Sequence, residues 1–181
     1  MKPIRVLLVD DQTLFVDSLR IVMEKTGSDE SEVVGSAHSG SEAVSLAEEC
    51  EPEVILMDIR MPGMNGVEAT RIIHERKPDI RIIMLTTYDD EEYIHDAMKA
   101  GASGYLLKNV QAADLLASVQ NVRHGTMLIS PSIVTALLNQ SESPTQPFAS
   151  YDGDATAAQL VKTLSVRERD VLSYAMKAYS N

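Results

Sequence analysis

The chain has 181 residues, of which 44% are hydrophobic and 24% are charged, and its formal net charge is −11. This length and composition suffice for a buried core, which excludes disorder throughout. No apolar run approaches the ~18 residues that a membrane span needs, and the single cysteine excludes an intramolecular disulfide. We therefore expect a soluble cytoplasmic protein that does not bind membranes.

The negative charge is unevenly placed along the chain. Residues 1–140 contain 22 acidic and 12 basic residues, whereas residues 141–181 are close to neutral. An acidic surface repels the phosphate backbone of nucleic acids. We expect the first 140 residues to attract a cation rather than DNA.

Strand-like and helix-like segments alternate five times in residues 1–125. The strand-like segments are mostly continuous runs of Val, Ile and Leu, which are typical of strands buried on both faces: Ile4–Asp10, Val33–Ala37, Val54–Asp58, Ile80–Thr86 and Gly104–Leu107. Each run is followed by apolar residues at helical spacing, led by Phe15, Ala43, Val67, Ile94 and Ala112. The alternation predicts an α/β fold in which a five-stranded, doubly wound, flavodoxin-like parallel sheet carries helices on both faces.

The composition changes after residue 125. Ser130 and Pro131 favour a short helix, and residues 139–156 are rich in Ser, Pro, Gln, Thr and Asp, as in flexible linkers. Residues 157–181 are again helical in pattern, and Ser165 with Glu168 has the spacing of a capping box. We therefore divide the chain into a domain (1–125), a short helix with a linker (126–156) and a short helical C-terminal segment (157–181).

Polar residues stand at the ends of four of the five predicted strands. The first strand ends in Asp10 and Asp11, the third in Asp58 and the fourth in Thr86, while the fifth leads into Lys108. In open parallel sheets, ligands bind outside the carboxyl ends of the strands. Three crowded carboxylates repel one another unless a cation relieves them, and oxygen ligands without His or Cys favour Mg²⁺ or Mn²⁺.

Each of these residues alone also has an ordinary structural explanation. A lone Asp commonly caps a helix or a turn, a lone Lys is commonly a surface residue, and a lone Thr is common in strands. Five such residues gathered at the strand ends favour a functional site over five separate coincidences.

Four stretches carry a specific resemblance. In order and spacing, "VLLVDDQ", "VILMDIRMPGMNG", "IIMLTT" and "GASGYLLK" resemble the receiver domain of bacterial two-component response regulators across residues 3–125. The resemblance implies that Asp58 is the phosphoacceptor. It also implies that Asp10, Asp11, Asp58 and the backbone carbonyl of Arg60 hold Mg²⁺.

The resemblance assigns further roles around the phosphoryl group. Thr86 and Lys108 would each bind a phosphoryl oxygen, and Tyr105 would turn inward when Thr86 moves. The chemistry agrees, because a carboxylate is a weak nucleophile and attacks phosphorus only when the charge on the phosphoryl oxygens is neutralised. A phosphoryl group adds about −2 charge, so it could bias such a two-state element.

Two features of the sequence limit what the family pattern implies for this chain. Asn109 follows Lys108, where the family often has a proline after a cis peptide bond; a non-proline cis bond costs about 3–4 kcal/mol. Arg60 and Tyr88 follow Asp58 and Thr86 by two residues. The resemblance implies that side chains at these two positions overlook the phosphoryl site. The geometry of the lysine loop therefore stays open at this point.

The resemblance implies a signalling switch rather than an enzyme. A sensor histidine kinase would donate the phosphoryl group from a phosphohistidine, and phosphorylation would promote homodimers. The alternatives are an Mg²⁺-dependent aspartyl-phosphate hydrolase, disfavoured because Arg60 stands where such enzymes want a second acid, and a flavodoxin-like cofactor binder. The acidic "DDQ" loop disfavours the latter because it offers no cradle for a phosphate.

The C-terminal segment carries a second resemblance. "LSVRERDVL" resembles the start of the LuxR-type helix-turn-helix of NarL/FixJ regulators, whose recognition helix enters the major groove. The 181 residues end before that recognition helix, so we expect a truncated DNA-binding domain. We expect transcription regulation through DNA only where the remaining helix-turn-helix residues are present.

Overall fold

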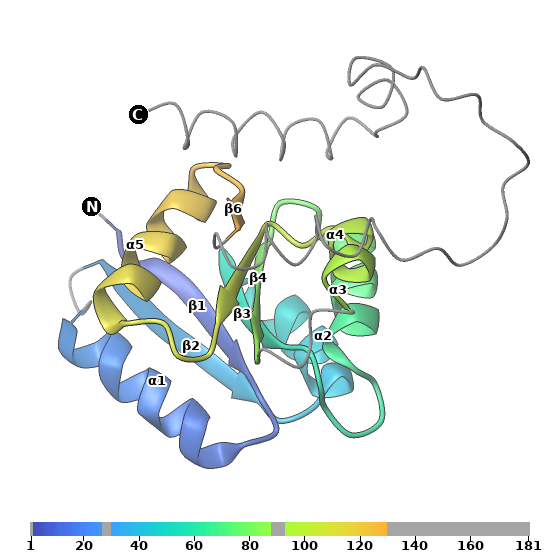
Figure 1. The fold of residues 1–181 in the computed structure, drawn as a ribbon, viewed down its shortest axis with the longest axis horizontal. Helices are drawn as coiled ribbons and strands as arrows, with labels where there is room; N and C mark the ends of the chain where they lie inside the picture. The colour runs from blue at the N-terminus through green and yellow to red at the C-terminus, as the bar shows by residue number, and fades with distance from the viewer. Residues whose placement is uncertain (1, 27–29, 88–92, 130–181) are drawn as a thin grey trace, which may run out of the picture. The chain divides into compact units, whose positions relative to one another are not determined.

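A computed structural model of the chain describes residues 2–26, 30–87 and 93–129 (Figure 1). Its elements are β1 (Ile4–Val9), α1 (Thr13–Thr26), β2 (Ser31–Ala37), α2 (Gly40–Cys50), β3 (Val54–Asp58), α3 (Gly66–Arg76), β4 (Arg81–Thr86), α4 (Ile94–Ala100), β5 (Gly104–Leu107), α5 (Ala112–Arg123) and β6 (Leu128–Ile129). The predicted helix after Ser130, the linker and the C-terminal segment lie outside the described residues, as does Tyr88. Among the described helices, none combines the length and the apolar character that crossing a bilayer requires.

The strands form one parallel sheet in the order β2-β1-β3-β4-β5-β6. The predicted parallel α/β architecture is confirmed, and two strands, β3 and β5, have the predicted bounds. The strand order reverses between β1 and β3, which is where open α/β sheets bind their ligands.

The number of strands is a correction, because the described residues contain six strands and not five. The sixth, β6, pairs Leu128 with Gly104 and Ile129 with Tyr105. Gly125 has φ = +87°, a backbone angle that favours glycine, and there the chain leaves α5 and turns back along β5. A two-residue strand is too short for any periodicity to predict it.

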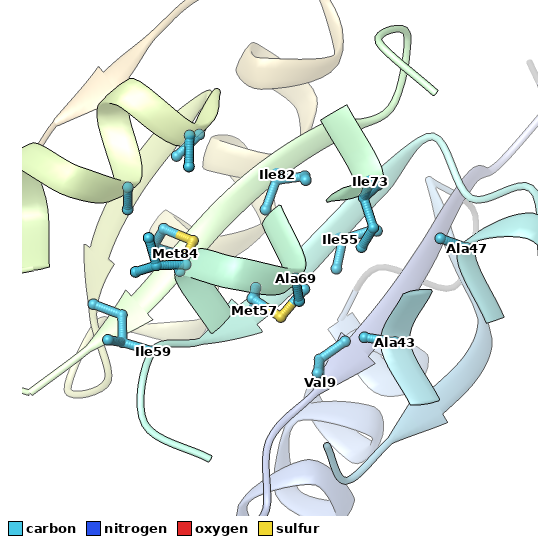
Figure 2. Close-up of a cluster of buried hydrophobic side chains, with 14 of the residues drawn as sticks. Val9, Ala43, Ala47, Ile55, Met57, Ile59, Ala69, Ile73, Ile82 and Met84 are labelled. Carbon is cyan, nitrogen blue, oxygen red and sulfur yellow. The ribbon is translucent and has the colours of Figure 1, made fainter. Parts of the chain in front are cut away.

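Both faces of the sheet are covered by helices, as the continuous apolar runs predict. Ile4, Val6 and Leu8 of β1 pack with α1 and α5, whereas Leu7 and Val9 face the other way and pack with α2, α3 and α4. Figure 2 shows part of the second cluster, in which Val9 lies near Ala43 and the side chains of β3 and β4 meet those of α3. The core fixes the strand ends at one edge, because every strand is held from both sides.

The loop between β3 and α3 is held close to the end of β3. Asn65 caps α3, since its side chain accepts a hydrogen bond from Glu68 N while the Glu68 carboxylate accepts one from Asn65 N. Gly66 N donates to Ile59 O at 2.9 Å. A Cβ atom on Gly66 would stand 1.9 Å from Asp58 O, so only glycine permits this approach.

Candidate functional site

The carboxyl ends of β1, β3 and β5 bring two carboxylates and one ammonium group together. Lys108 Nζ lies 2.9 Å from Asp10 Oδ2 and 3.0 Å from Asp58 Oδ1. Asp10 is 1% exposed and Asp58 is 3% exposed. Three residues that are far apart in the sequence therefore form one buried ionic cluster, as their positions at the strand ends predict.

Backbone groups hold the two carboxylates in place. Asp58 Oδ1 accepts a hydrogen bond from Ile59 N, and Asp10 Oδ1 accepts one from Gln12 N, both at 2.9 Å. Asp10 Oδ2 is buried and lies within ion-pair distance of Lys108, yet it makes no hydrogen bond of acceptable geometry to any of the described residues. Because an ionised carboxylate offers about four lone-pair sites, Asp10 keeps capacity to bind a further cation.

The cluster shifts the pKa of two of its members. Burial, followed by the negative charge of Asp10, raises the pKa of Asp58 from 3.8 to about 6, although Lys108 and the Ile59 N–H oppose the shift. Burial lowers the pKa of Lys108, but its contacts with Asp10 and Asp58 outweigh burial, so the net shift is upward. One lysine therefore does not fully compensate the negative charge at this edge.

A third carboxylate completes a candidate metal site. Asp10, Asp11 and Asp58 each offer an oxygen, and these oxygens lie within 4.8 Å of one another; Asp11 is exposed and the other two are buried. Three carboxylates with a single lysine between them suit a hard divalent cation such as Mg²⁺. The residues present therefore fit the cation that the sequence predicts.

Arg60 lies beside these acids. It lines an open depression of about 430 Å³ together with Asp11, Ile59, Met61, Pro62, Gly63, Asn65 and Tyr93. Its guanidinium carbon stands 5.5 Å from the centre of the Tyr93 ring, within the range of a cation–π contact. The residue whose carbonyl was predicted to bind metal thus shares an opening with Asp11.

Thr86 and Tyr105 are both buried. The Thr86 hydroxyl donates to Thr87 O at 3.0 Å, and Lys108 N donates to Thr86 O at 2.8 Å, so the ends of β4 and β5 are joined. The Tyr105 hydroxyl donates to Tyr93 O at 3.2 Å and to Ile94 O at 3.3 Å. Its ring therefore lies inward, and its hydroxyl reaches the first turn of α4.

The peptide bond after Lys108 is trans, because the described residues contain no cis peptide bond. This answers the question that Asn109 raises in the sequence. The loop is closed by the bond from Lys108 N to Thr86 O and by a 3.0 Å bond from Val110 N to Leu107 O. Lys108 reaches both carboxylates from this trans loop.

One neighbour of the cluster is missed by sequence reasoning. The centre of the Phe15 ring lies 5.1 Å from Lys108 Nζ. The sequence indicates Phe15 only as the first apolar residue of a helix stripe. Asp11 lies before α1 begins at Thr13, so no helical spacing in the sequence links Phe15 to the acidic pair.

Comparison with known proteins gives consistent results at the level of family. Residues 6–120 match the family described as "Response regulator receiver domain". The chain is 38% identical over 137 residues to the transcriptional regulatory protein LnrK of Bacillus subtilis, covering 76% of this chain and 61% of LnrK. It is 35% identical to the transcriptional regulatory protein DegU of Brevibacillus brevis, covering 98% of this chain and 77% of DegU.

Solved structures agree with this result. A two-component response regulator of the LuxR family from Aurantimonas superposes with a TM-score of 0.71 at 30% sequence identity, covering 78% of this chain and all of that one. The chain thus spans about three fifths of the length of LnrK and about three quarters of DegU. The solved structure from Aurantimonas shares the fold described above.

Proposed function

We propose that Asp58 of this chain, which belongs to the family of response regulator receiver domains, accepts a phosphoryl group in an Mg²⁺-dependent reaction. The observation that carries the proposal is the buried cluster of Asp10, Asp58 and Lys108, with Asp11 at its rim. Negative charge concentrated there is poorly compensated without a cation. A site of this kind suits the capture of a metal-bound phosphoryl group.

In the proposed reaction, a carboxylate oxygen of Asp58 attacks the phosphorus atom of the donor. The bond between phosphorus and the leaving group breaks, and the leaving group takes the electron pair. With a pKa of about 6, Asp58 is ionised at neutral pH and can supply the attacking oxygen. Asp10, Asp11, Asp58 and the Arg60 carbonyl would hold Mg²⁺, which when bound supplies positive charge to the phosphoryl oxygens.

Lys108 and Thr86 would then bind the product. Once Asp58 is an acyl phosphate, its Oδ1 no longer carries the charge that Lys108 contacts at 3.0 Å, and the ammonium group can turn to a phosphoryl oxygen. The Thr86 hydroxyl would leave Thr87 O and donate to another phosphoryl oxygen. Tyr105, already anchored to the start of α4, would report that movement to α4.

The proposal extends to partners. Membership of the family implies a cognate histidine kinase, and we propose that a phosphohistidine of a sensor kinase in the cytoplasm is the donor. The phosphorylated chain would pair with a second copy. Because LnrK and DegU are named as transcriptional regulatory proteins, we propose that the whole protein regulates transcription by binding DNA.

The hydrolase alternative has less support. An aspartyl-phosphate hydrolase needs an acid to protonate the leaving group, and Arg60 occupies the position two residues after Asp58. The guanidinium group of Arg60 instead faces Tyr93. The family is a family of response regulators and not of classical enzymes.

The test is incubation with acetyl phosphate and Mg²⁺, followed by intact mass measurement. We expect one phosphate per chain in the wild type, none in Asp58→Asn, and a strongly reduced amount in Asp11→Asn or with a chelator. Glu53→Gln, at the opposite edge of the sheet, serves as the matched control and should be labelled like the wild type. Many turnovers of acetyl phosphate without an adduct would support the hydrolase instead.

A further inference from the structure

The ammonium group of Lys108 has an aromatic ring beside it as well as two carboxylates. Its Nζ atom lies 5.1 Å from the centre of the Phe15 ring, within the ~6 Å over which a ring attracts a cation. The Lys108 side chain is only 13% exposed. Water therefore competes weakly for the ammonium group, and a ring contact at such a site is stronger than one in open solvent.

The turn that holds Asp10 also holds the ring. Gln12 N donates to Asp10 Oδ1 at 2.9 Å, while Gln12 O accepts bonds from Phe15 N at 2.9 Å and from Val16 N at 3.1 Å. The ring and the carboxylate are thus fixed by a single turn at the start of α1. Lys108, by contrast, reaches the site on a flexible four-carbon stem.

Core packing alone does not explain why an aromatic residue stands at position 15. Phe15 is only partly buried against the cluster shared by α1 and α5, and its neighbour Leu14 is 81% exposed. The start of α1 is therefore a rim and not a core position. An aromatic ring at this rim has a specific neighbour, which is the Lys108 ammonium group.

We propose that Phe15 is a positioning residue for Lys108, and that its ring keeps the ammonium group in place while Lys108 exchanges the Asp58 carboxylate for a phosphoryl oxygen. This inference rests on the proposed function. The attraction of a ring for a cation is broad and has no single acceptor atom, so a small shift of the ammonium group costs little. The charged contact with Asp58 is lost when that residue is esterified, whereas the contacts of Lys108 with Asp10 and with the Phe15 ring remain.

The test compares the initial rates of Asp58 phosphorylation by acetyl phosphate at saturating Mg²⁺. Phe15→Leu, which keeps an apolar side chain but removes the ring, should slow the reaction about threefold to tenfold, the range expected for a partly desolvated cation–π contact. Phe15→Tyr and Phe15→Trp should restore a rate close to that of the wild type. Val33→Ala, which reduces packing in the same cluster on β2, is the matched control and should leave the rate unchanged.

A spectroscopic measurement tests the contact itself. In the wild type, the ring current of Phe15 should shift the NMR signals of the Lys108 ε-methylene group, assigned with Lys108→Arg. The shift should disappear in Phe15→Leu and remain in Phe15→Tyr. A purely structural role for Phe15 would predict equal effects of Phe15→Leu and Phe15→Tyr on the rate.

Each result has one meaning. If Phe15→Leu is phosphorylated as fast as the wild type, or if Phe15→Tyr is as slow as Phe15→Leu while both are folded by thermal unfolding, the inference is wrong. Should Phe15→Leu not fold, Phe15→Met decides in its place, since it is apolar, flexible and not aromatic. If the wild type itself forms no adduct, the proposed function fails, and the NMR shift still tests the ring contact.

Discussion

The two edges of the sheet both carry ion pairs, and they differ in how the charge is compensated. At the amino edge, Arg123 pairs with Glu53 at 3.0 Å, with both side chains about one third exposed (33% and 34%). At the carboxyl edge, Lys108 pairs with two buried carboxylates, those of Asp10 and Asp58, and a third carboxylate, that of Asp11, lies beside them. The pair at the amino edge is matched in charge and partly exposed, whereas the carboxyl edge holds more negative than positive charge, two of its carboxylates being buried.

The difference separates stability from function. An exposed pair contributes about 0–1 kcal/mol, because water solvates both charges well. A buried cluster with unequal charges costs free energy, which a bound cation or a proton can recover. The uncompensated charge at the carboxyl edge therefore destabilises the free protein, and binding of the proposed Mg²⁺ ion removes this destabilisation.

Removing the cation from each edge should give the largest contrast. Lys108→Met leaves Asp10 and Asp58 buried without a positive partner, and at pH 8 we expect a loss of about 3–5 kcal/mol in the free energy of unfolding. Arg123→Met is the matched control and should cost less than about 1 kcal/mol. Urea denaturation measures both, and equal losses at the two edges would contradict the comparison.

The pH dependence of stability should reveal the free-energy cost of burying the charged Asp58 carboxylate. Its pKa is raised on folding from 3.8 to about 6, so the folded state binds the proton more tightly, and stability is lost as the pH rises through this window. Relative to Asp58→Asn, the wild type should lose about 2 kcal/mol between pH 4 and pH 8, most of it between pH 4 and 6.

Thermal or urea unfolding of both proteins across this pH range measures the difference. Glu53→Gln provides the reference for a partly exposed acid, and its difference in stability from the wild type should be nearly flat with pH. If the stability difference between the wild type and Asp58→Asn is also flat with pH, burial does not perturb the pKa of Asp58.

Mg²⁺ should stabilise the carboxyl edge. At a free concentration ten times the dissociation constant, binding to the folded state alone raises the free energy of unfolding by about 1.4 kcal/mol. We expect this gain in the wild type and in Glu53→Gln, and little of it in Asp11→Asn, because a metal-binding carboxylate is removed. A gain of the same size in Asp11→Asn would exclude that residue as a ligand.

The smallest effect is expected from salt at the amino edge. Glu53→Gln should change the free energy of unfolding by less than about 1 kcal/mol at low ionic strength, and the change should shrink further in 1 M salt because exposed pairs are screened. The Lys108→Met effect should be screened much less. A comparable salt dependence at both edges would mean that the carboxyl cluster is as solvated as the amino pairs.

Much of the fold could be predicted because burial on both faces leaves a simple signal. Residues 54–58 are all buried, and the continuous apolar run predicted both ends of that strand. The strand Leu128–Ile129 could not be predicted, since its existence depends on pairing with residues more than twenty positions earlier. Pairing of this kind is a tertiary interaction and leaves no local pattern.

The site could be predicted where chemistry follows strand ends, and not where it depends on side-chain reach. Asp10, Asp58 and Lys108 meet because parallel strands end at one edge. The Phe15 ring meets Lys108 only because of the rotamers and the exact start of a helix. The functional roles of all the site residues, including the phosphoacceptor role of Asp58 and the switch roles of Thr86 and Tyr105, stay predictions.

The most direct test of the account is to locate the phosphoryl group. The wild type is incubated with acetyl phosphate in the presence and absence of Mg²⁺, the acyl phosphate is trapped by borohydride reduction, and the modified residue is identified by tandem mass spectrometry. The account predicts modification of Asp58 that depends on Mg²⁺. Modification of another residue, or of Asp58 to the same extent without a divalent cation, would contradict it.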